Sequence, residues 1–250
     1  MVLRKNLLIT GASSGLGEGM ARQFAAKGRN LALCARRTER LEKLAAELTA
    51  AHPGIEVVTR TLDVTDHDRV FAVFEEFRAE LGSLDRVIVN AGLGKGQPVG
   101  KGRFDANRQT IEVNFVAAAA QIEAAAGIFR AQGAGHLAVI SSFSAIRGLP
   151  GTLTAYAASK AGISAFVDGT RIELKRKGIA VTDVRPGYIE SEMNDRIGRN
   201  PLLAKADTGA RALAKAIEAE PARAYVPAWP WVPLSVVMRV VPASVLRRIL

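Results

Sequence analysis

Two side chains in the second half of the sequence have types and a spacing suited to proton transfer. Tyr156 and Lys160 lie four positions apart, so on a helix they share one face. A free tyrosine has a pKa of about 10 and is a poor base at neutral pH. A lysine ammonium nearby favours the phenolate and lowers that pKa. We therefore predict that the pair exchanges a proton with a carbonyl or alcohol oxygen, the alternative being an exposed helical pair without a role.

A glycine-rich turn near the N-terminus is suited to binding a pyrophosphate. Its sequence is Thr10-Gly11-Ala12-Ser13-Ser14-Gly15-Leu16-Gly17. It follows an apolar segment over 6–10 and opens a helical pattern formed by Leu16, Met20 and Phe24. Glycines let the backbone approach a phosphate closely, and the helix N-terminus offers free N–H groups and a positive dipole end. This context predicts a dinucleotide site, with a tight turn that binds nothing as the alternative.

Further motifs stand at the ends of the predicted strands or between them. They are Asn90-Ala91-Gly92, Asn114, Ser142 and Pro186-Gly187. Together with T-G-x-x-x-G-x-G and Y-x-x-x-K, their order from about residue 6 to 193 resembles the short-chain dehydrogenase/reductase family. The resemblance implies a nicotinamide-dependent oxidoreductase with a Rossmann-like fold.

The resemblance also assigns roles to four residues, namely Asn114, Ser142, Tyr156 and Lys160. Ser142 would hydrogen-bond the substrate oxygen and fix it near Tyr156, which acts as the general acid or base. Lys160 would additionally hold the nicotinamide ribose hydroxyls. Asn114 would hold a water that links Lys160 to solvent.

Two positions depart from the family pattern. Ser142 precedes Tyr156 by fourteen residues, one more than the commonest spacing, so Ser141 and Ser144 are rivals and Ser144 is the stronger. Where the family often has a threonine that binds the nicotinamide carboxamide, this chain has Ser191, which keeps a hydroxyl group.

The end of the second predicted strand indicates which cofactor is preferred. An acid there suits the ribose 2′-hydroxyl of NAD, whereas a cation suits the 2′-phosphate of NADP. The chain reads Ala35-Arg36-Arg37, so NADP(H) is predicted, with Arg36 as the bidentate partner of the phosphate. Two solvent-facing arginines that open a helix are the alternative. The whole predicted cofactor-binding set is Gly11, Ser13, Ser14, Gly15, Leu16, Gly17, Arg36, Arg37, Asp63, Val64, Asn90, Ala91, Gly92, Tyr156, Lys160, Pro186, Gly187, Ile189 and Ser191.

Alternating strands and helices must position these residues. Near-continuous apolar runs predict buried parallel strands over 6–10, 30–35, 56–62, 85–90, 136–141, 179–185 and 223–226. Helical patterns lie between them, including two long alanine-rich helices near 110–132 and 155–177. This alternation predicts a single doubly wound α/β domain, with a parallel sheet of about seven strands and helices on both faces.

Composition excludes several other classes of protein. The chain has 250 residues, one cysteine and three scattered histidines, so neither an intrachain disulfide nor a Cys/His zinc site is expected, and no metal is assigned. The net charge is +10, but the basic residues are dispersed and do not alternate with aromatic ones, so nucleic acid is not an expected partner. The N-terminus lacks the pattern of a signal peptide, and a cytoplasmic protein is predicted.

Two segments in the last third of the chain stand apart. We expect a flap over about 188–207, and we divide the chain into a Rossmann-like domain over 1–227 and an apolar, proline-containing tail over 228–250. If 234–241 is helical, Ser235 and Arg239 form a narrow polar stripe, and the helix needs burial over most of its circumference. Burial in its own cleft or against a partner subunit is favoured over contact with a membrane surface.

The sequence thus predicts an NADP(H)-dependent enzyme that catalyses reversible carbonyl reduction and alcohol oxidation. An NAD-linked dehydrogenase of the same family and a non-catalytic NADP-binding redox sensor are the alternatives. The predicted partners are a small carbonyl or alcohol substrate and further copies of the chain in a homodimer or homotetramer. The flap could close over a lipophilic ketone or aldehyde, and polyols and sugars remain open alternatives. A membrane or nucleic-acid adaptor that uses the basic charge is a third class.

Overall fold

Apolar runs at the predicted positions form a parallel sheet that is buried on both faces. The computed structural model describes residues 3–192, 200–242 and 244–245. The strand order is β3-β2-β1-β4-β5-β6-β7, and all six pairings are parallel. The strands are β1 Asn6–Thr10, β2 Asn30–Ala35, β3 Val57–Thr61, β4 Arg86–Val89, β5 Gly135–Ile140, β6 Ile179–Pro186 and β7 Arg223–Val226. The predicted sheet of about seven strands is confirmed.

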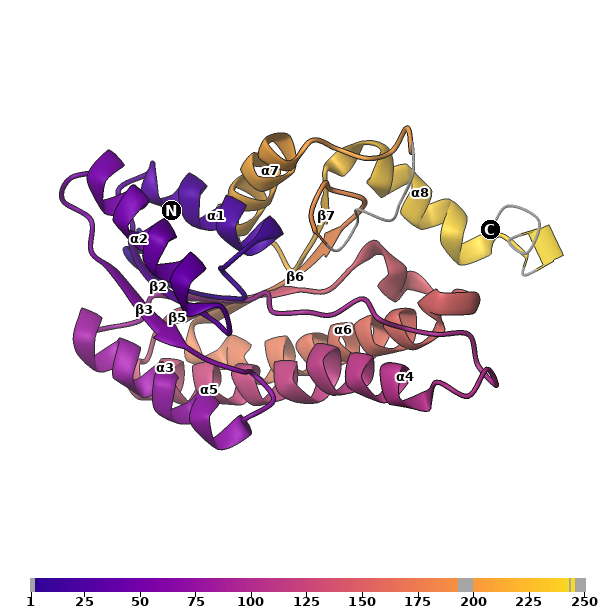
Figure 1. Cartoon of the computed structure of the whole chain (residues 1–250), viewed down its shortest axis with the longest axis horizontal. Helices are drawn as coiled ribbons and strands as arrows, with labels where there is room; N and C mark the ends of the chain where they lie inside the picture. Colours follow the sequence, from indigo (N-terminus) through magenta and orange to yellow (C-terminus); the bar gives the residue numbers. More distant parts are fainter. Residues whose placement is uncertain (1–2, 193–199, 243, 246–250) are drawn as a thin grey trace.

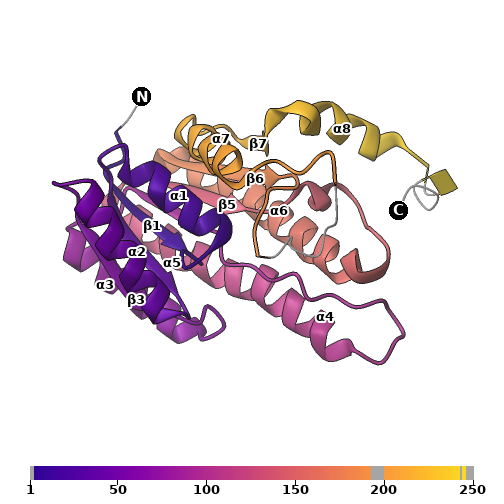
Figure 2. The same cartoon turned by 45° about the horizontal axis from the view of Figure 1, so that its top comes forward.

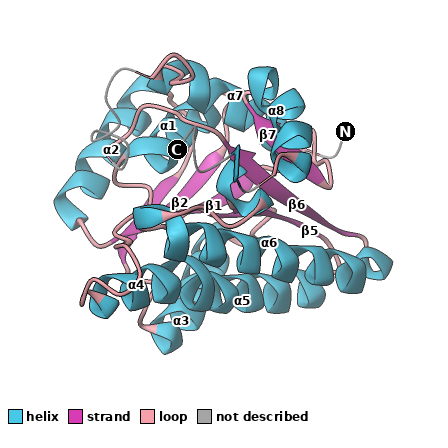
Figure 3. Ribbon diagram, turned by 90° about the vertical axis from the view of Figure 1, so that its right-hand side faces the viewer, coloured by secondary structure: helices cyan, strands magenta, loops and turns pink. Residues whose placement is uncertain are grey.

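Helices cover both faces of this sheet (Figures 1 and 3). The layer on one face contains α1 Gly15–Ala25, α2 Thr38–Ala51 and α7 Ala206–Glu218. The layer on the other contains α3 His67–Leu81, α4 Phe104–Ile111, α5 Ala117–Gln132 and α6 Thr154–Leu174. Each layer packs its apolar stripe on the sheet, so two hydrophobic cores sandwich the strands. The predicted doubly wound α/β fold is confirmed.

The order of the strands reverses between β1 and β4. In an open parallel sheet, such a switch point creates a crevice outside the carboxyl ends of the strands. The glycine-rich turn follows β1 and the Asn90-Ala91-Gly92 segment follows β4. Both motifs therefore meet in this crevice.

One predicted helix is longer than its sequence pattern indicated. The helix expected to begin near residue 110 begins at Phe104 and runs to Gln132 through a π-helical turn, Glu112–Val116. By length and composition it could cross a membrane, but 44% of its most apolar window is buried in the protein. It packs against α3 and α6, which explains its apolar composition by core packing.

The C-terminal helix differs from its prediction in extent and orientation. Helix α8 spans Ala228–Val240, six residues more at its start than expected. Ser235 lies on the buried side of α8, whereas Val236 and Val240 are exposed. The Ser235 hydroxyl donates to the Val232 carbonyl within the helix at 2.7 Å, which satisfies it without solvent. Within one chain α8 therefore buries only one side, and whether a partner subunit or a membrane covers its valines stays a prediction.

The predicted flap is described only in part. Ile189 and Ala204 form a parallel β-bridge, which joins the segment after β6 to the segment before α7. Between them, residues 193–199 lie outside the described part of the chain. The division between residues 227 and 228 stays a prediction.

Candidate active site

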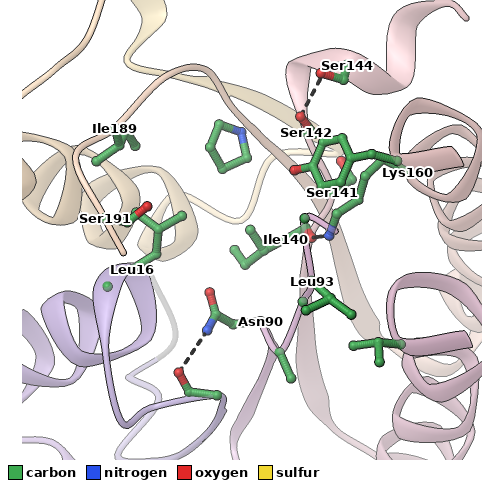
Figure 4. Close-up of a pocket in the computed structure, with 18 of the residues that line it drawn as sticks. Leu16, Asn90, Leu93, Ile140, Ser141, Ser142, Ser144, Lys160, Ile189 and Ser191 are labelled. Carbon is green, nitrogen blue, oxygen red and sulfur yellow. Dashed lines mark hydrogen bonds between the residues drawn. The ribbon is translucent and has the colours of Figure 1, made fainter. Parts of the chain in front are cut away.

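A pocket of about 590 Å³ lies at the carboxyl ends of the strands and contains most of the predicted site residues. Ser142 and Lys160 lie on one side of it, and Leu16, Ile189 and Ser191 lie on another (Figure 4). Its volume is typical of a small-molecule site. All the predicted site residues line it except Gly17 and Asn114.

The glycine-rich turn is held by close backbone contacts. Gly11 has a φ of +66°, a conformation that favours glycine. A Cβ on Gly17 would lie 2.3 Å from the Gly11 carbonyl oxygen and 2.7 Å from the Asn90 side-chain nitrogen. That nitrogen donates to the Thr10 carbonyl at 2.9 Å (Figure 4). Asn90 thus links the end of β4 to the glycine-rich turn by a hydrogen bond. The sequence pattern predicted only a cofactor-binding role for this residue.

The start of α1 has free backbone donors that face the pocket. Ser14 is the N-cap residue, but its side chain does not cap the helix. Its hydroxyl instead accepts a hydrogen bond from Arg37, and the Ser13 hydroxyl accepts another from Arg37 at 3.2 Å. The helix N-terminus therefore keeps unsatisfied N–H groups beside a guanidinium, a combination that attracts phosphate oxygens.

The arginines after β2 face a carboxylate from the flap. Glu192 accepts from Arg37 at 2.9 Å and from Arg40, and both arginines are about half exposed. These cations lower the pKa of Glu192 to about 2. Sequence reasoning missed Arg40 and Glu192 as partners of this site, because their contact spans 152 positions along the chain.

Two residues of the predicted cofactor-binding set, Asp63 and Val64, follow β3 and lie beside these arginines. Val64 is buried and Asp63 is exposed, and both line the pocket. Asp63 accepts from the backbone and hydroxyl of Thr65 at 3.0 and 2.8 Å. It is therefore an acceptor within its own turn.

Tyr156, Lys160 and Ser142 come together across the pocket from α6 and the end of β5. Tyr156 and Ser142 are hydrogen-bond partners, and the Lys160 Nζ lies 6.0 Å from the centre of the tyrosine ring. The Lys160 ammonium donates to the Ile140 carbonyl at 2.9 Å, which fixes the long side chain against β5 (Figure 4). Three residues, two from α6 and one from the end of β5, thus surround one small volume.

The protonation of this group differs from the sequence-based expectation. Burial raises the pKa of Tyr156, and the hydrogen bond with Ser142 opposes that rise only partly. Burial lowers the pKa of Lys160 to about 8, with Asp183 acting in the opposite direction. The pKa of Tyr156 is therefore raised where a lowering was predicted, because desolvation outweighs the hydrogen bond with Ser142.

The three candidate serines have different environments. The Ser141 hydroxyl donates to Asp183 and also contacts the Val184 carbonyl at 3.1 Å, so it is committed to β6. Ser142 accepts from the Ser144 backbone N–H at 3.0 Å and starts a 3₁₀ turn, Phe143–Ile146. Of the three, Ser142 is the one in hydrogen-bond contact with Tyr156.

Asn114 lies on the π-helical turn and holds the loop after β4. Its side-chain oxygen accepts from the Leu93 N–H at 2.7 Å, and its nitrogen donates to the Leu93 carbonyl at 2.8 Å. The same nitrogen lies 3.3 Å from the Ser159 hydroxyl. These bonds occupy the amide, so the structure indicates that the side chain positions the loop. The water link to Lys160 stays a prediction.

The segment that follows β6 forms one wall of the pocket. Gly187 has no room for a side chain, because a Cβ there would lie 1.9 Å from the Trp231 ring. Ile189 is buried, and the Ser191 side chain lies against Gly15 at the start of α1. Pro186, Gly187 and Ser191 therefore border the same space as the glycine-rich turn.

Sequence reasoning missed an aromatic wall. The Trp231 ring, from α8, packs edge-on against Phe143 at 4.7 Å and against Tyr188 at 5.4 Å between ring centres. Leu234 and Met238, one and two turns along α8, continue this wall into the pocket. The tail was expected to seek the cleft, but its periodicity did not show which side chains would enter.

Comparison with known proteins agrees with this geometry. Residues 5–201 match the family model described as short chain dehydrogenase. An uncharacterised oxidoreductase of Mycobacterium tuberculosis strain H37Rv is 53% identical over 247 residues, which cover 99% of this chain and 98% of that protein.

Two solved structures are informative about the fold and the cofactor. An alcohol dehydrogenase from the archaeon Thermococcus sibiricus, complexed with 5-hydroxy-NADP, is 30% identical with a TM-score of 0.77, covering 86% of this chain and 90% of that one. A 3-oxoacyl-[acyl-carrier protein] reductase from Brucella melitensis in complex with NAD is 25% identical with a TM-score of 0.78, covering 90% and 96%. With its motifs, fold and relatives in agreement, the chain belongs to the short-chain dehydrogenase/reductase family of oxidoreductases.

Proposed function

We propose that this chain is an NADP(H)-dependent oxidoreductase that interconverts a lipophilic ketone or aldehyde and the matching alcohol. The observation that carries the proposal is the meeting of Tyr156, Ser142 and Lys160 at one end of a pocket whose other end is lined by Arg36 and Arg37. The first end suits proton transfer to an oxygen atom, and the second suits a phosphate.

The cofactor would lie along the carboxyl ends of the strands. The start of α1, the arginines after β2, the Asn90-Ala91-Gly92 segment and the Pro186–Ser191 segment would hold it. When bound, NADPH supplies the hydride for carbonyl reduction. The contact that excludes a side chain at Gly17 supports this assignment, since it keeps the turn close enough for backbone donors to reach a pyrophosphate.

The residues of the chain would divide the remaining work. Ser142 would donate a hydrogen bond to the substrate oxygen and hold it near the Tyr156 hydroxyl. Tyr156 would give its proton to that oxygen during reduction and accept a proton during oxidation. Its raised pKa favours the protonated form at neutral pH, which is the form that reduction requires. Lys160, fixed by the Ile140 carbonyl, would stabilise the phenolate as the proton leaves.

The substrate end of the pocket supports an apolar substrate. Phe143, Tyr188, Trp231, Leu234 and Met238 line it, and most of their surface is hydrocarbon. We therefore favour a ketone or aldehyde with an aromatic or alicyclic body over a sugar or polyol. The expected assembly remains a homodimer or homotetramer, as in many members of the family.

We expect the purified chain to oxidise NADPH in the presence of apolar ketones or aldehydes. A panel of ketosteroids, aryl ketones, β-ketoacyl thioesters and sugars tests this, with loss of NADPH absorbance as the readout. The apolar compounds should give the higher kcat/KM, because they match the aromatic wall. Turnover of sugars alone would contradict the substrate class, and binding of NADPH without turnover of any compound would favour the redox-sensor alternative.

We also expect NADPH to bind at least about tenfold more tightly than NADH, because a charge-assisted contact is worth about 1.5–3 kcal/mol. Fluorescence titration of the protein with each cofactor measures this preference. Arg36→Ala and Arg37→Ala should each weaken NADPH binding about tenfold and change NADH binding little. Arg211→Ala, which removes an exposed guanidinium paired with Asp207 on α7, is the matched control. Equal affinities for the two cofactors would instead establish the NAD-linked alternative.

A further inference from the structure

The side of α8 that faces away from the pocket is an exposed apolar surface. We call Trp229, Val232, Val236, Val237 and Val240 the outer face of α8; their exposed fractions are 78, 46, 57, 52 and 75%. Val232, Val236 and Val240 are four positions apart, so they form one stripe along the helix. A contiguous stripe of this kind marks an interaction surface, in contrast to a single exposed apolar residue.

Attachment of α8 to the domain holds this face outward. Trp231 and Ser235 are buried on the opposite side of the helix. The Arg147 guanidinium donates to the Met238 and Val241 carbonyls at 3.2 and 2.6 Å, which anchors the C-terminal end of α8. The outer face therefore cannot turn into the pocket without breaking these contacts.

A second exposed apolar and basic segment lies at the same end of the molecule. This basic loop, residues 93–103, leads into α4 and carries Lys95, Lys101 and Arg103 with no acidic residue. Val99 in the loop and Phe104 at the start of α4 are both more than 70% exposed. Figures 1 and 2 show α8 and the start of α4 at one end of the fold, and the pocket is lined from both sides by these two segments.

The charges around these apolar side chains are mostly positive. From residue 221 to the C-terminus the sequence has four arginines and no acidic residue, and of these Arg223 pairs with Asp168. In the described part of the chain, Lys95, Lys101 and Arg239 form no ion pair, while Arg103 pairs with Asp105. Exposed apolar residues beside uncompensated cations match the boundary between acyl chains and anionic headgroups. Trp229 has the amphipathic ring that is enriched at this depth.

A second copy of the chain matches this surface less well. A twofold contact would bring the same patch of each subunit together, so Lys95, Lys101 and Arg239 would face their own copies, with Asp105 as the acid beside them. We propose that the outer face of α8, together with the basic loop, docks this protein on an anionic membrane surface. The proposal does not depend on the cofactor or the substrate.

Sedimentation with lipid vesicles tests the proposal on the full chain without added cofactor. Vesicles of phosphatidylcholine with about one-third phosphatidylglycerol should pellet the protein, and pure phosphatidylcholine should do so at least about tenfold less well, since each nearby cation adds roughly 1 kcal/mol. Raising the salt concentration should weaken the binding. Binding that is equal on both vesicles, or absent on both, would overturn the proposal.

Substitutions on the exposed surface locate the contact. The double variant Val236→Asp/Val240→Asp should lose most vesicle binding, and Lys101→Glu should weaken it severalfold. Ile172→Asp is the matched control, because Ile172 is 76% exposed on α6 near the opposite ends of the strands. Circular dichroism should show the same melting temperature for all four proteins. Equal binding of the double variant and the unchanged protein would contradict the assignment of the outer face.

A fluorescence measurement and a mass measurement complete the test. Trp231→Phe leaves Trp229 as the single tryptophan, and its emission should shift to shorter wavelength when anionic vesicles are added. Light scattering without lipid measures the mass of the particle and so tests whether a second copy of the chain covers this surface instead. If Val236→Asp/Val240→Asp halves the mass of the particle and vesicles do not shift the Trp229 emission, the surface is an interface between copies and the membrane proposal is wrong.

Discussion

Tyr156→Phe is expected to lower kcat by about 10²–10⁴-fold, because this is the usual contribution of a positioned general acid or base. The substitution removes one hydroxyl and keeps the ring, so the packing of α6 should not change. NADPH binding should stay within about threefold of the unchanged protein. Stopped-flow measurement of NADPH oxidation, together with a cofactor titration, separates the two effects. A variant that keeps half of its turnover would show that Tyr156 does not transfer the proton.

Parallel serine variants test the partner of that tyrosine. Ser142→Ala should lower kcat severely, since it removes the hydroxyl that contacts Tyr156. Ser144→Ala should have a small effect, because Ser144 is seen to contact Ser142 through its backbone N–H, which alanine keeps. If Ser144→Ala is the inactive variant, the assignment of the serine is wrong by two positions.

The parts of the fold and the site that were predictable from the sequence depend on short stretches of chain. Buried parallel strands read as apolar runs, and each motif follows directly from the end of a strand or lies on one helix. Because parallel strands align their carboxyl ends, Gly11, Asn90 and Ser142 must approach one another once the strand order is known. Tyr156 and Lys160 needed only the helical repeat.

The remaining features depend on contacts that no local pattern encodes. The bridge from Glu192 to Arg37 joins positions 155 apart, and the contact between the Trp231 and Phe143 rings joins positions 88 apart. The sequence showed that Ser235 and Arg239 share one side of α8. It did not show whether that side faces the protein or the solvent. The raised pKa of Tyr156 follows from burial, which becomes known only when the surrounding side chains are in place.

Truncation after Pro227 is expected to raise the KM for an apolar ketone about a hundredfold. It removes Trp231, Leu234 and Met238 from the pocket wall, and a hundredfold change corresponds to about 2.7 kcal/mol, which is the order of burying one apolar side chain. It also uncovers Leu149 and Leu153, against which α8 packs, so the protein should aggregate more readily. NADPH should still bind, since the main contacts of α8 are with β7 and the turn Phe143–Ile146, away from the glycine-rich turn and the arginines after β2. Steady-state kinetics, cofactor titration and light scattering measure the three effects.

A shorter truncation after Pro242 is the matched control, because it removes eight residues and leaves all of α8 in place. It should keep the KM of the full chain. Trp231→Ala isolates the inner side of the helix and should raise KM about tenfold, while vesicle binding by the outer face stays intact. A truncation after Pro227 that remains soluble and keeps both kcat and KM would contradict the aromatic wall. If this truncated protein kept its kinetics but no longer bound anionic vesicles, membrane binding through the outer face would be the only function of α8. The inner and outer sides of one helix can thus be tested separately, since Trp231 and Val236 point in different directions from the same axis.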